Sequence, residues 1–135
     1  MPRRLGGVRI LIVDDHQDAR EAMRLILESL GVTVDLARNG AEALSVAQAN
    51  PPDVIFCDLR MPRMDGFAFL EHVRGDPKLR RSRVIAVSGL ASEDDVSRTW
   101  EAGFDGHLVK PTSYDGLVAQ LKRTLWSRYR EALTW

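Results

Sequence analysis

The chain has 135 residues, 44% of them hydrophobic, and its 19 basic and 19 acidic side chains leave no formal net charge. A chain of this length forms one ordinary domain that buries roughly two thirds of the surface its unfolded form exposes, which suffices for a core without crosslinks. The charge balance argues against direct nucleic-acid binding, which needs a strongly positive surface. Cys57 is the single cysteine, so an intramolecular disulfide is excluded.

The N-terminal residues 1–7 are predicted to form a tail before the first apolar stretch, VRILIV at 8–13. This stretch is too short for the hydrophobic region of a signal peptide and far too short to span a membrane. We therefore expect a cytoplasmic protein with no membrane association.

Short segments rich in β-branched and apolar residues alternate along the chain with segments of helical spacing. The predicted strands, in chain order, are 8–13, 32–36, 53–57, 83–87 and 106–109. The predicted helices that follow each strand are 18–30, 40–49, 67–74, 93–102 and a last helix that begins near Ser113 and buries Leu117, Leu121 and Leu125. Gly31 is placed to end the first helix, and Asn39 and Ser92 are placed to begin the second and the fourth.

Strict alternation of strand and helix predicts an α/β fold, a doubly wound parallel sheet of five strands flanked by five helices. The crossovers in such a sheet are right-handed, which leaves few topologies. Ligands bind beyond the carboxyl ends of the strands, where the strand order reverses. Polar residues that follow the strands are therefore the first candidates for a functional site.

Five polar residues occupy these strand ends: Asp14, Asp15, Asp58, Ser88 and Lys110. Two carboxylates about 4 Å apart repel by about 4 kcal/mol at an effective dielectric near 20, so a positive group is needed among them. An oxygen-rich site without cysteine ligands or paired histidines suits Mg²⁺ or Mn²⁺ better than Zn²⁺. Taken alone, Asp14 and Asp15 could also be a solvated helix start, and Ser88 could cap a loop.

Four motifs show a resemblance to a known family: LIVDD at 11–15, DLRMPRMDG at 58–66, VSG at 87–89 and AGFDGHLVKP at 102–111. Together they resemble the receiver domain of bacterial two-component response regulators of the chemotaxis-regulator type. The resemblance spans 8–126 and leaves 127–135 as a C-terminal helix extension or tail. For the fold it implies the flavodoxin-like strand order 2-1-3-4-5.

The resemblance implies that Asp58 takes a phosphoryl group from a histidine kinase or a phosphotransfer protein of a phosphorelay. Asp15, Asp58 and the backbone carbonyl of Arg60 would bind the metal ion directly, and Asp14 would act through water or orient the other ligands. The side chain of Arg60 would either shield the acyl phosphate or be solvated. The protein would catalyse only its own phosphorylation and dephosphorylation, without turnover of an external substrate.

Lys110 and Ser88 would contact the phosphoryl oxygens. His107 stands where related receivers usually carry Tyr or Phe, so with Ser88 it would form the conformational switch; an ordinary half-exposed histidine is the competing interpretation. A cis peptide bond is expected before Pro111.

The surface of the fourth helix, fifth strand and fifth helix would carry the output of the switch and could form a homodimer. Trp100 would anchor a partner there or pack against the sheet instead. Trp126, Tyr129 and Leu133 recur at spacings of three and four, which predicts a longer last helix with an apolar stripe.

Two other functions compete with the receiver interpretation. An aspartyl-nucleophile phosphohydrolase usually carries a second acid two residues after the nucleophile, where this chain has Arg60. A flavin-binding module of the same architecture needs a phosphate-cradling loop after the first strand, and DDHQDA has the opposite charge. Within the receiver interpretation, a stand-alone regulator and a domain of a larger protein both remain open.

Overall fold

A computed structural model of the chain describes residues 5–89 and 93–129. It contains a five-stranded sheet in the order β2-β1-β3-β4-β5, in which every pair of neighbouring strands is parallel. The elements, in chain order, are β1 (Arg9–Val13), α1 (Gln17–Glu28), β2 (Thr33–Ala37), α2 (Gly40–Ala49), β3 (Val54–Asp58), α3 (Gly66–Gly75), β4 (Arg83–Ser88), α4 (Glu93–Ala102), β5 (Gly106–Val109) and α5 (Tyr114–Tyr129). The predicted fold class and strand order are confirmed.

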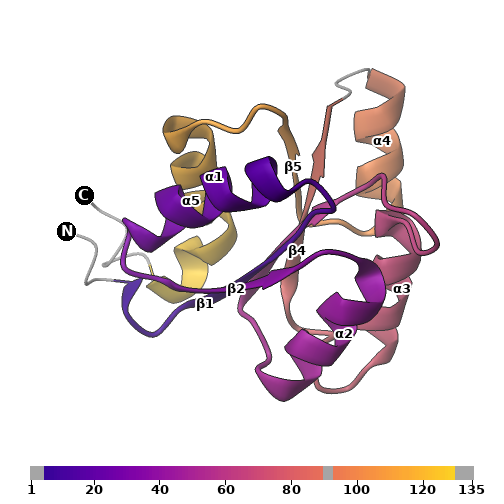
Figure 1. Cartoon of the computed structure of the whole chain (residues 1–135), viewed down its shortest axis with the longest axis horizontal. Coiled ribbons are helices and arrows are strands. Elements are labelled where there is room, and N and C mark those ends of the chain that lie inside the picture. Colours follow the sequence, from indigo (N-terminus) through magenta and orange to yellow (C-terminus); the bar gives the residue numbers. More distant parts are fainter. Residues whose placement is uncertain (1–4, 90–92, 130–135) are drawn as a thin grey trace.

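The helices cover both faces of the sheet, with α1 and α5 on one side and α2, α3 and α4 on the other (Figure 1). Alternate strand residues supply the two cores, because successive side chains of a strand point to opposite faces. Ile12 and Phe56 pack with Leu117 of α5 in the first core. Leu11 and Cys57 pack in the second, which also holds the buried side chains of α2 and α3.

Two residues predicted to begin or end helices, Asn39 and Gly31, do so in the structure. The Asn39 side chain caps α2 by accepting a hydrogen bond from the Glu42 backbone N–H at 2.8 Å. Gly31 has φ of 86° just after α1, a conformation that glycine adopts without strain. Leu5 differs from the expected tail, since it is 1% exposed and belongs to the first core. The predicted start at Ser92 lies outside the described residues.

The C-terminal helix α5 extends to Tyr129, as the apolar stripe after Leu125 suggests. Leu117, Leu121 and Leu125 are buried, whereas Trp126 is 49% exposed. Leu133 lies outside the described part of the chain.

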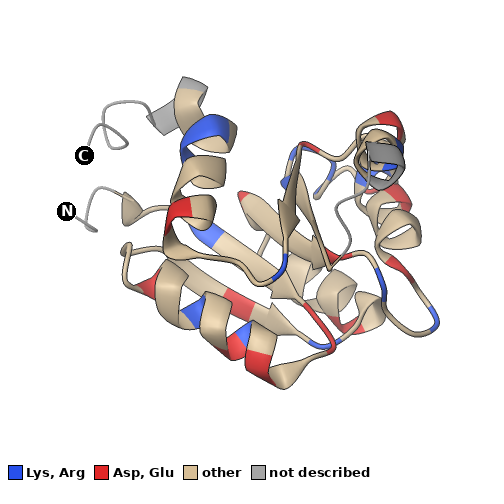
Figure 2. Cartoon of the chain, turned by 90° about the horizontal axis from the view of Figure 1, so that it is seen from above, with Lys and Arg blue, Asp and Glu red and all other residues tan. Residues whose placement is uncertain are grey.

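Basic and acidic residues are interspersed along the helices (Figure 2). Among the described residues, no helix is long and apolar enough to cross a membrane.

Candidate functional site

The site is built at the carboxyl ends of β1 and β3, where the strand order reverses. Asp14 follows β1 and is 1% exposed, and Asp58 ends β3 and is 4% exposed. The backbone N–H of Asp14 donates to the Ala37 carbonyl at 3.1 Å, which continues the β1–β2 ladder by one residue. Regular sheet structure thus fixes the backbone from which each of the two carboxylates projects.

Backbone N–H groups orient the two buried carboxylates. His16, the N-cap residue of α1, donates its backbone N–H to Asp14 Oδ1 at 2.9 Å. The backbone N–H of Arg60 donates to Asp58 Oδ1 at 3.2 Å. The second oxygen of each carboxylate, Oδ2, faces the Lys110 ammonium.

The start of α3 approaches the end of β3 very closely at Gly66. The Gly66 backbone N–H donates to the Leu59 carbonyl at 3.0 Å. A β-carbon on Gly66 would lie 2.8 Å from the Asp58 carbonyl oxygen and 2.9 Å from the Leu59 α-carbon. Only glycine at position 66 therefore allows the 58–66 segment to fold back against the backbone of Asp58 and Leu59.

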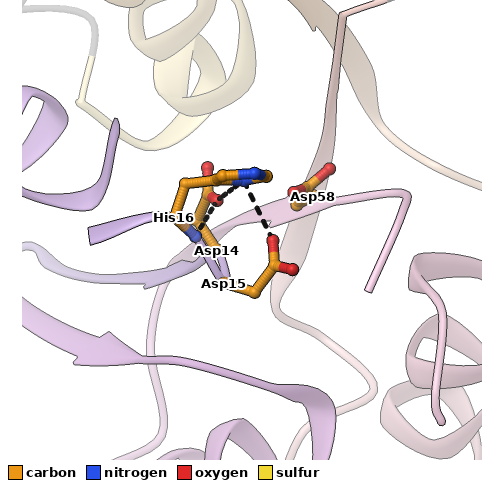
Figure 3. A group of neighbouring side chains, drawn as sticks. All are labelled: Asp14, Asp15, His16 and Asp58. Atoms are coloured by element: carbon orange, nitrogen blue, oxygen red, sulfur yellow. Dashed lines mark hydrogen bonds and ion pairs between the residues drawn. The ribbon is translucent and has the colours of Figure 1, made fainter. Parts of the chain in front are cut away.

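Three carboxylates and one imidazole converge beyond these strand ends (Figure 3). One ligand atom from each of Asp14, Asp15, His16 and Asp58 lies within 4.8 Å of the others. The three carboxylates form an oxygen-rich donor set that fits Mg²⁺ or Mn²⁺, and two of them are buried. His16 Nδ1 lies 3.1 Å from Asp15 Oδ1, at the exposed rim of the cluster.

Lys110 supplies positive charge from the end of β5. Its Nζ lies 2.8 Å from Asp14 Oδ2 and 3.3 Å from Asp58 Oδ2. Its backbone N–H donates to the Ser88 carbonyl at 2.8 Å, and the expected cis bond between Lys110 and Pro111 is present. The ammonium therefore bridges the two buried carboxylates.

Burial and charge act in opposite directions on these groups. Burial raises the pKa of the Asp58 carboxyl, and the Arg60 N–H and Lys110 only partly offset this effect. Burial also works against the Lys110 charge, but the hydrogen bond to Asp14 and the Asp58 carboxylate outweigh it, so the pKa of Lys110 is raised. The pocket thus favours a positive charge, and an ionised Asp58 is costly there.

Ser88, at the end of β4, is 4% exposed and makes a contact with the β5 residue His107. Ser88 Oγ lies 3.1 Å from His107 Nε2, and His107 Nδ1 lies 3.1 Å from Thr99 Oγ1 on α4. The predicted switch pair is therefore in direct contact, and the partly buried His107 ring also reaches the fourth helix.

A cleft of about 530 Å³ opens at the β3–α3 segment, which begins with Leu59 directly after Asp58. Its lining includes Arg60 from the β3–α3 segment, Ser88 from β4 and Arg98 from α4. Arg98 lies over the Phe67 ring, with its guanidinium carbon 4.9 Å from the ring centroid. The Arg60 side chain is exposed at this cleft.

The structure brings together most of the residues that the sequence singles out. Asp14, Asp15, Asp58 and Lys110 meet in one cluster, and Ser88 and His107 meet beside it. Sequence reasoning missed His16 and Thr99. The position of His16 directly after two acids was the available signal, whereas nothing in the local sequence marks Thr99 as a partner of His107.

Comparisons with known proteins agree with this geometry. The family model of the response regulator receiver domain matches residues 10–122. The chain is 39% identical over 103 residues to the gliding motility regulatory protein of Myxococcus xanthus, covering 76% of this chain and 13% of that protein. It is 35% identical over 122 residues to the response regulator MprA of Mycobacterium tuberculosis, covering 88% of this chain and 51% of MprA.

Among solved structures, the chemotaxis response regulator CheY4 of Vibrio cholerae matches with a TM-score of 0.82 and 32% identity, over 87% of this chain and 98% of that one. The chain therefore spans nearly all of one small regulator, but only 13% and 51% of the two longer regulators.

Proposed function

The chain belongs to the response regulator receiver domain family of two-component systems, and from this premise we propose that Asp58 is its phosphoacceptor. The contact of Asp58 Oδ2 with Lys110 Nζ at 3.3 Å, inside a cluster of acids, is the observation that carries the proposal. We propose that residues 8–126 form the receiver unit, with Leu5 packed against it and 127–129 continuing α5.

In the proposed reaction, an Asp58 carboxylate oxygen forms a bond to phosphorus as the bond from phosphorus to the histidine nitrogen of the donor breaks. The Arg60 N–H holds Asp58 Oδ1, so Oδ2, which faces the Lys110 ammonium, is the proposed attacking atom. Lys110 neutralises charge on the transferred group, and the Ser88 hydroxyl donates a hydrogen bond to one of its oxygens.

Asp15, Asp58 and the backbone carbonyl of Arg60 are the proposed direct ligands of Mg²⁺ or Mn²⁺, and Asp14 orients the other ligands. When bound, the ion would neutralise the carboxylates and the incoming phosphoryl oxygens. Asp14 also holds Lys110 in place through the 2.8 Å contact between Lys110 Nζ and Asp14 Oδ2.

The proposed donor is a histidine kinase or a phosphotransfer protein in the cytoplasm, and the proposed output surface is α4, β5 and α5. Exposed apolar side chains on these three elements support that assignment: Trp100 at 52%, Val109 at 41%, Tyr114 at 48% and Trp126 at 49%. A homodimer through this surface would bury them. Its formation on phosphorylation would appear as a doubled mass in light scattering, and Trp100→Ala would weaken it.

The direct test is incubation with a small acyl phosphate and Mg²⁺, followed by intact mass spectrometry. We expect a mass gain of one acid-labile phosphoryl group in the wild type and none in Asp58→Ala. Asp115→Ala is the matched control, because Asp115 is exposed on α5 and lies outside the acidic cluster. A gain that persists in Asp58→Ala would refute the assignment, and steady hydrolysis of a generic phosphate ester would favour a phosphohydrolase instead.

A further inference from the structure

Three side chains from three elements form a continuous polar chain that leads from the site to α4. Ser88 Oγ of β4 lies 3.1 Å from Nε2 of His107, and Nδ1 of the same ring lies 3.1 Å from Thr99 Oγ1. Thr99 is fully buried at 0% exposure, and Ser88 is 4% exposed. A buried hydroxyl next to an imidazole constrains which atom carries each proton.

The Thr99 hydroxyl determines the direction of these hydrogen bonds. It donates its single proton to the Val96 carbonyl at 2.7 Å, so toward His107 its oxygen acts as an acceptor. The acceptor requires a proton on His107 Nδ1. A neutral imidazole carries one N–H, so Nε2 offers a lone pair, and the Ser88 hydroxyl donates to it.

The backbone around the ring supports this arrangement. The side-chain amide of Gln120, which is 6% exposed, donates to the His107 carbonyl at 3.0 Å. A β-carbon on the neighbouring Gly106 would lie 2.6 Å from Gln120 Oε1, so glycine makes room for this contact. The imidazole is therefore held from its backbone as well as from both ring nitrogens.

We propose that Thr99 is a positioning residue for the receiver reaction: it holds His107 as the Nδ1–H tautomer and so directs the Ser88 hydroxyl proton toward His107 and away from the phosphoryl pocket. The inference rests on the proposed function in one respect, that Ser88 donates to a phosphoryl oxygen.

The single Ser88 proton cannot serve both acceptors. Ser88 also lines the cleft at the β3–α3 segment, together with Leu59 and Arg60, which follow Asp58 in the chain, so the hydroxyl has a second direction available. When Asp58 is phosphorylated, the hydroxyl turns into that cleft and its hydrogen bond to Nε2 breaks. The same ring contacts α4 through Thr99, so this event reaches the proposed output surface through one side chain.

The tautomer is tested first, on the unphosphorylated protein, by ¹⁵N NMR of the imidazole, with the His107 signals assigned from His107→Gln. The other two histidines, His16 and His72, are exposed. We expect the Nδ1–H tautomer in the wild type and in Thr99→Ser, which keeps the hydroxyl. In Thr99→Val we expect a shift toward the Nε2–H tautomer. A wild-type Nε2–H tautomer would overturn the proposal, even if Thr99→Val fails to fold.

The positioning role is tested by the initial rate of phosphorylation with a small acyl phosphate. With the competing acceptor removed, Thr99→Val should be phosphorylated about fivefold faster, the factor expected for one neutral hydrogen bond. Thr99→Ser should match the wild type. An unchanged rate in a Thr99→Val protein whose tautomer has shifted would refute the positioning role. Absence of any phosphoryl gain in the wild type would instead refute the proposed function and leave the tautomer result intact.

Discussion

Replacing Lys110 by methionine removes the positive charge that bridges the two buried carboxylates while keeping most of the side-chain volume. Its Nζ lies 2.8 Å from Asp14 Oδ2 and 3.3 Å from Asp58 Oδ2. At an effective dielectric of about 20, these contacts correspond to about 6 and about 5 kcal/mol of Coulomb attraction. Desolvation of the three groups offsets most of this energy, so the sum is not the stability contribution.

Breaking a buried ion pair by removing one partner costs about 3–5 kcal/mol, because the remaining charge is left uncompensated. The Lys110 side chain is 23% exposed, so water screens part of this effect. We therefore expect Lys110→Met to lower the free energy of unfolding by about 2–3 kcal/mol in metal-free buffer. For a domain of this length, the melting temperature would fall by about 10 °C.

Added Mg²⁺ should reverse much of this loss, since a divalent ion can replace the missing charge. An ion present at about 100 times its dissociation constant stabilises by about 2.7 kcal/mol. Thermal unfolding of both proteins, with EDTA and with Mg²⁺, measures the effect. Lys78→Met is the matched control, because Lys78 is exposed, its Nζ donates to the Gln48 carbonyl at 3.1 Å, and it lies outside the acidic cluster. An equal loss with and without Mg²⁺ would refute the reasoning.

Three further predictions concern the site and the fold around it. Burial raises the pKa of Asp58, so the protonated carboxyl contributes to stability below about pH 4, and this contribution is lost as the pH rises through the folded-state pKa. Asp58→Asn should therefore have a higher melting temperature than the wild type at neutral pH in EDTA, by a margin that shrinks in acid. A lower melting temperature of this variant at neutral pH would contradict the prediction. Gly66→Ala should cost about 1–3 kcal/mol and slow phosphorylation, because its β-carbon would meet the backbone at 2.8 Å; Gly75→Ala, with nothing within 4 Å, is the control and should be neutral in urea unfolding. Asn39→Ala should cost about 1 kcal/mol by removing the cap of α2, and an unchanged urea midpoint would show that the cap contributes nothing.

The element boundaries were predictable because they depend on local patterns. Apolar runs at 8–13, 53–57 and 83–87 lie within a residue or so of β1, β3 and β4. The predicted helix at 40–49 coincides with α2, since Asn39 caps its start and two prolines follow its end. Leu5 is a single apolar residue with no periodicity, so the sequence pattern places it in the tail, and only its packing shows that it belongs to the core.

The convergence of Asp14, Asp58 and Lys110 was also determined by the sequence, because parallel strands place all their carboxyl ends at one edge of the sheet. The sequence did not determine which of these side chains pair with one another. Lys110 lies closer to Asp14 than to Asp58, and Thr99 meets His107 across two elements. Periodicity specifies which face of an element is buried, whereas contacts between elements depend on the angle and register at which each helix packs on the sheet. Those quantities arise only when the whole core is assembled.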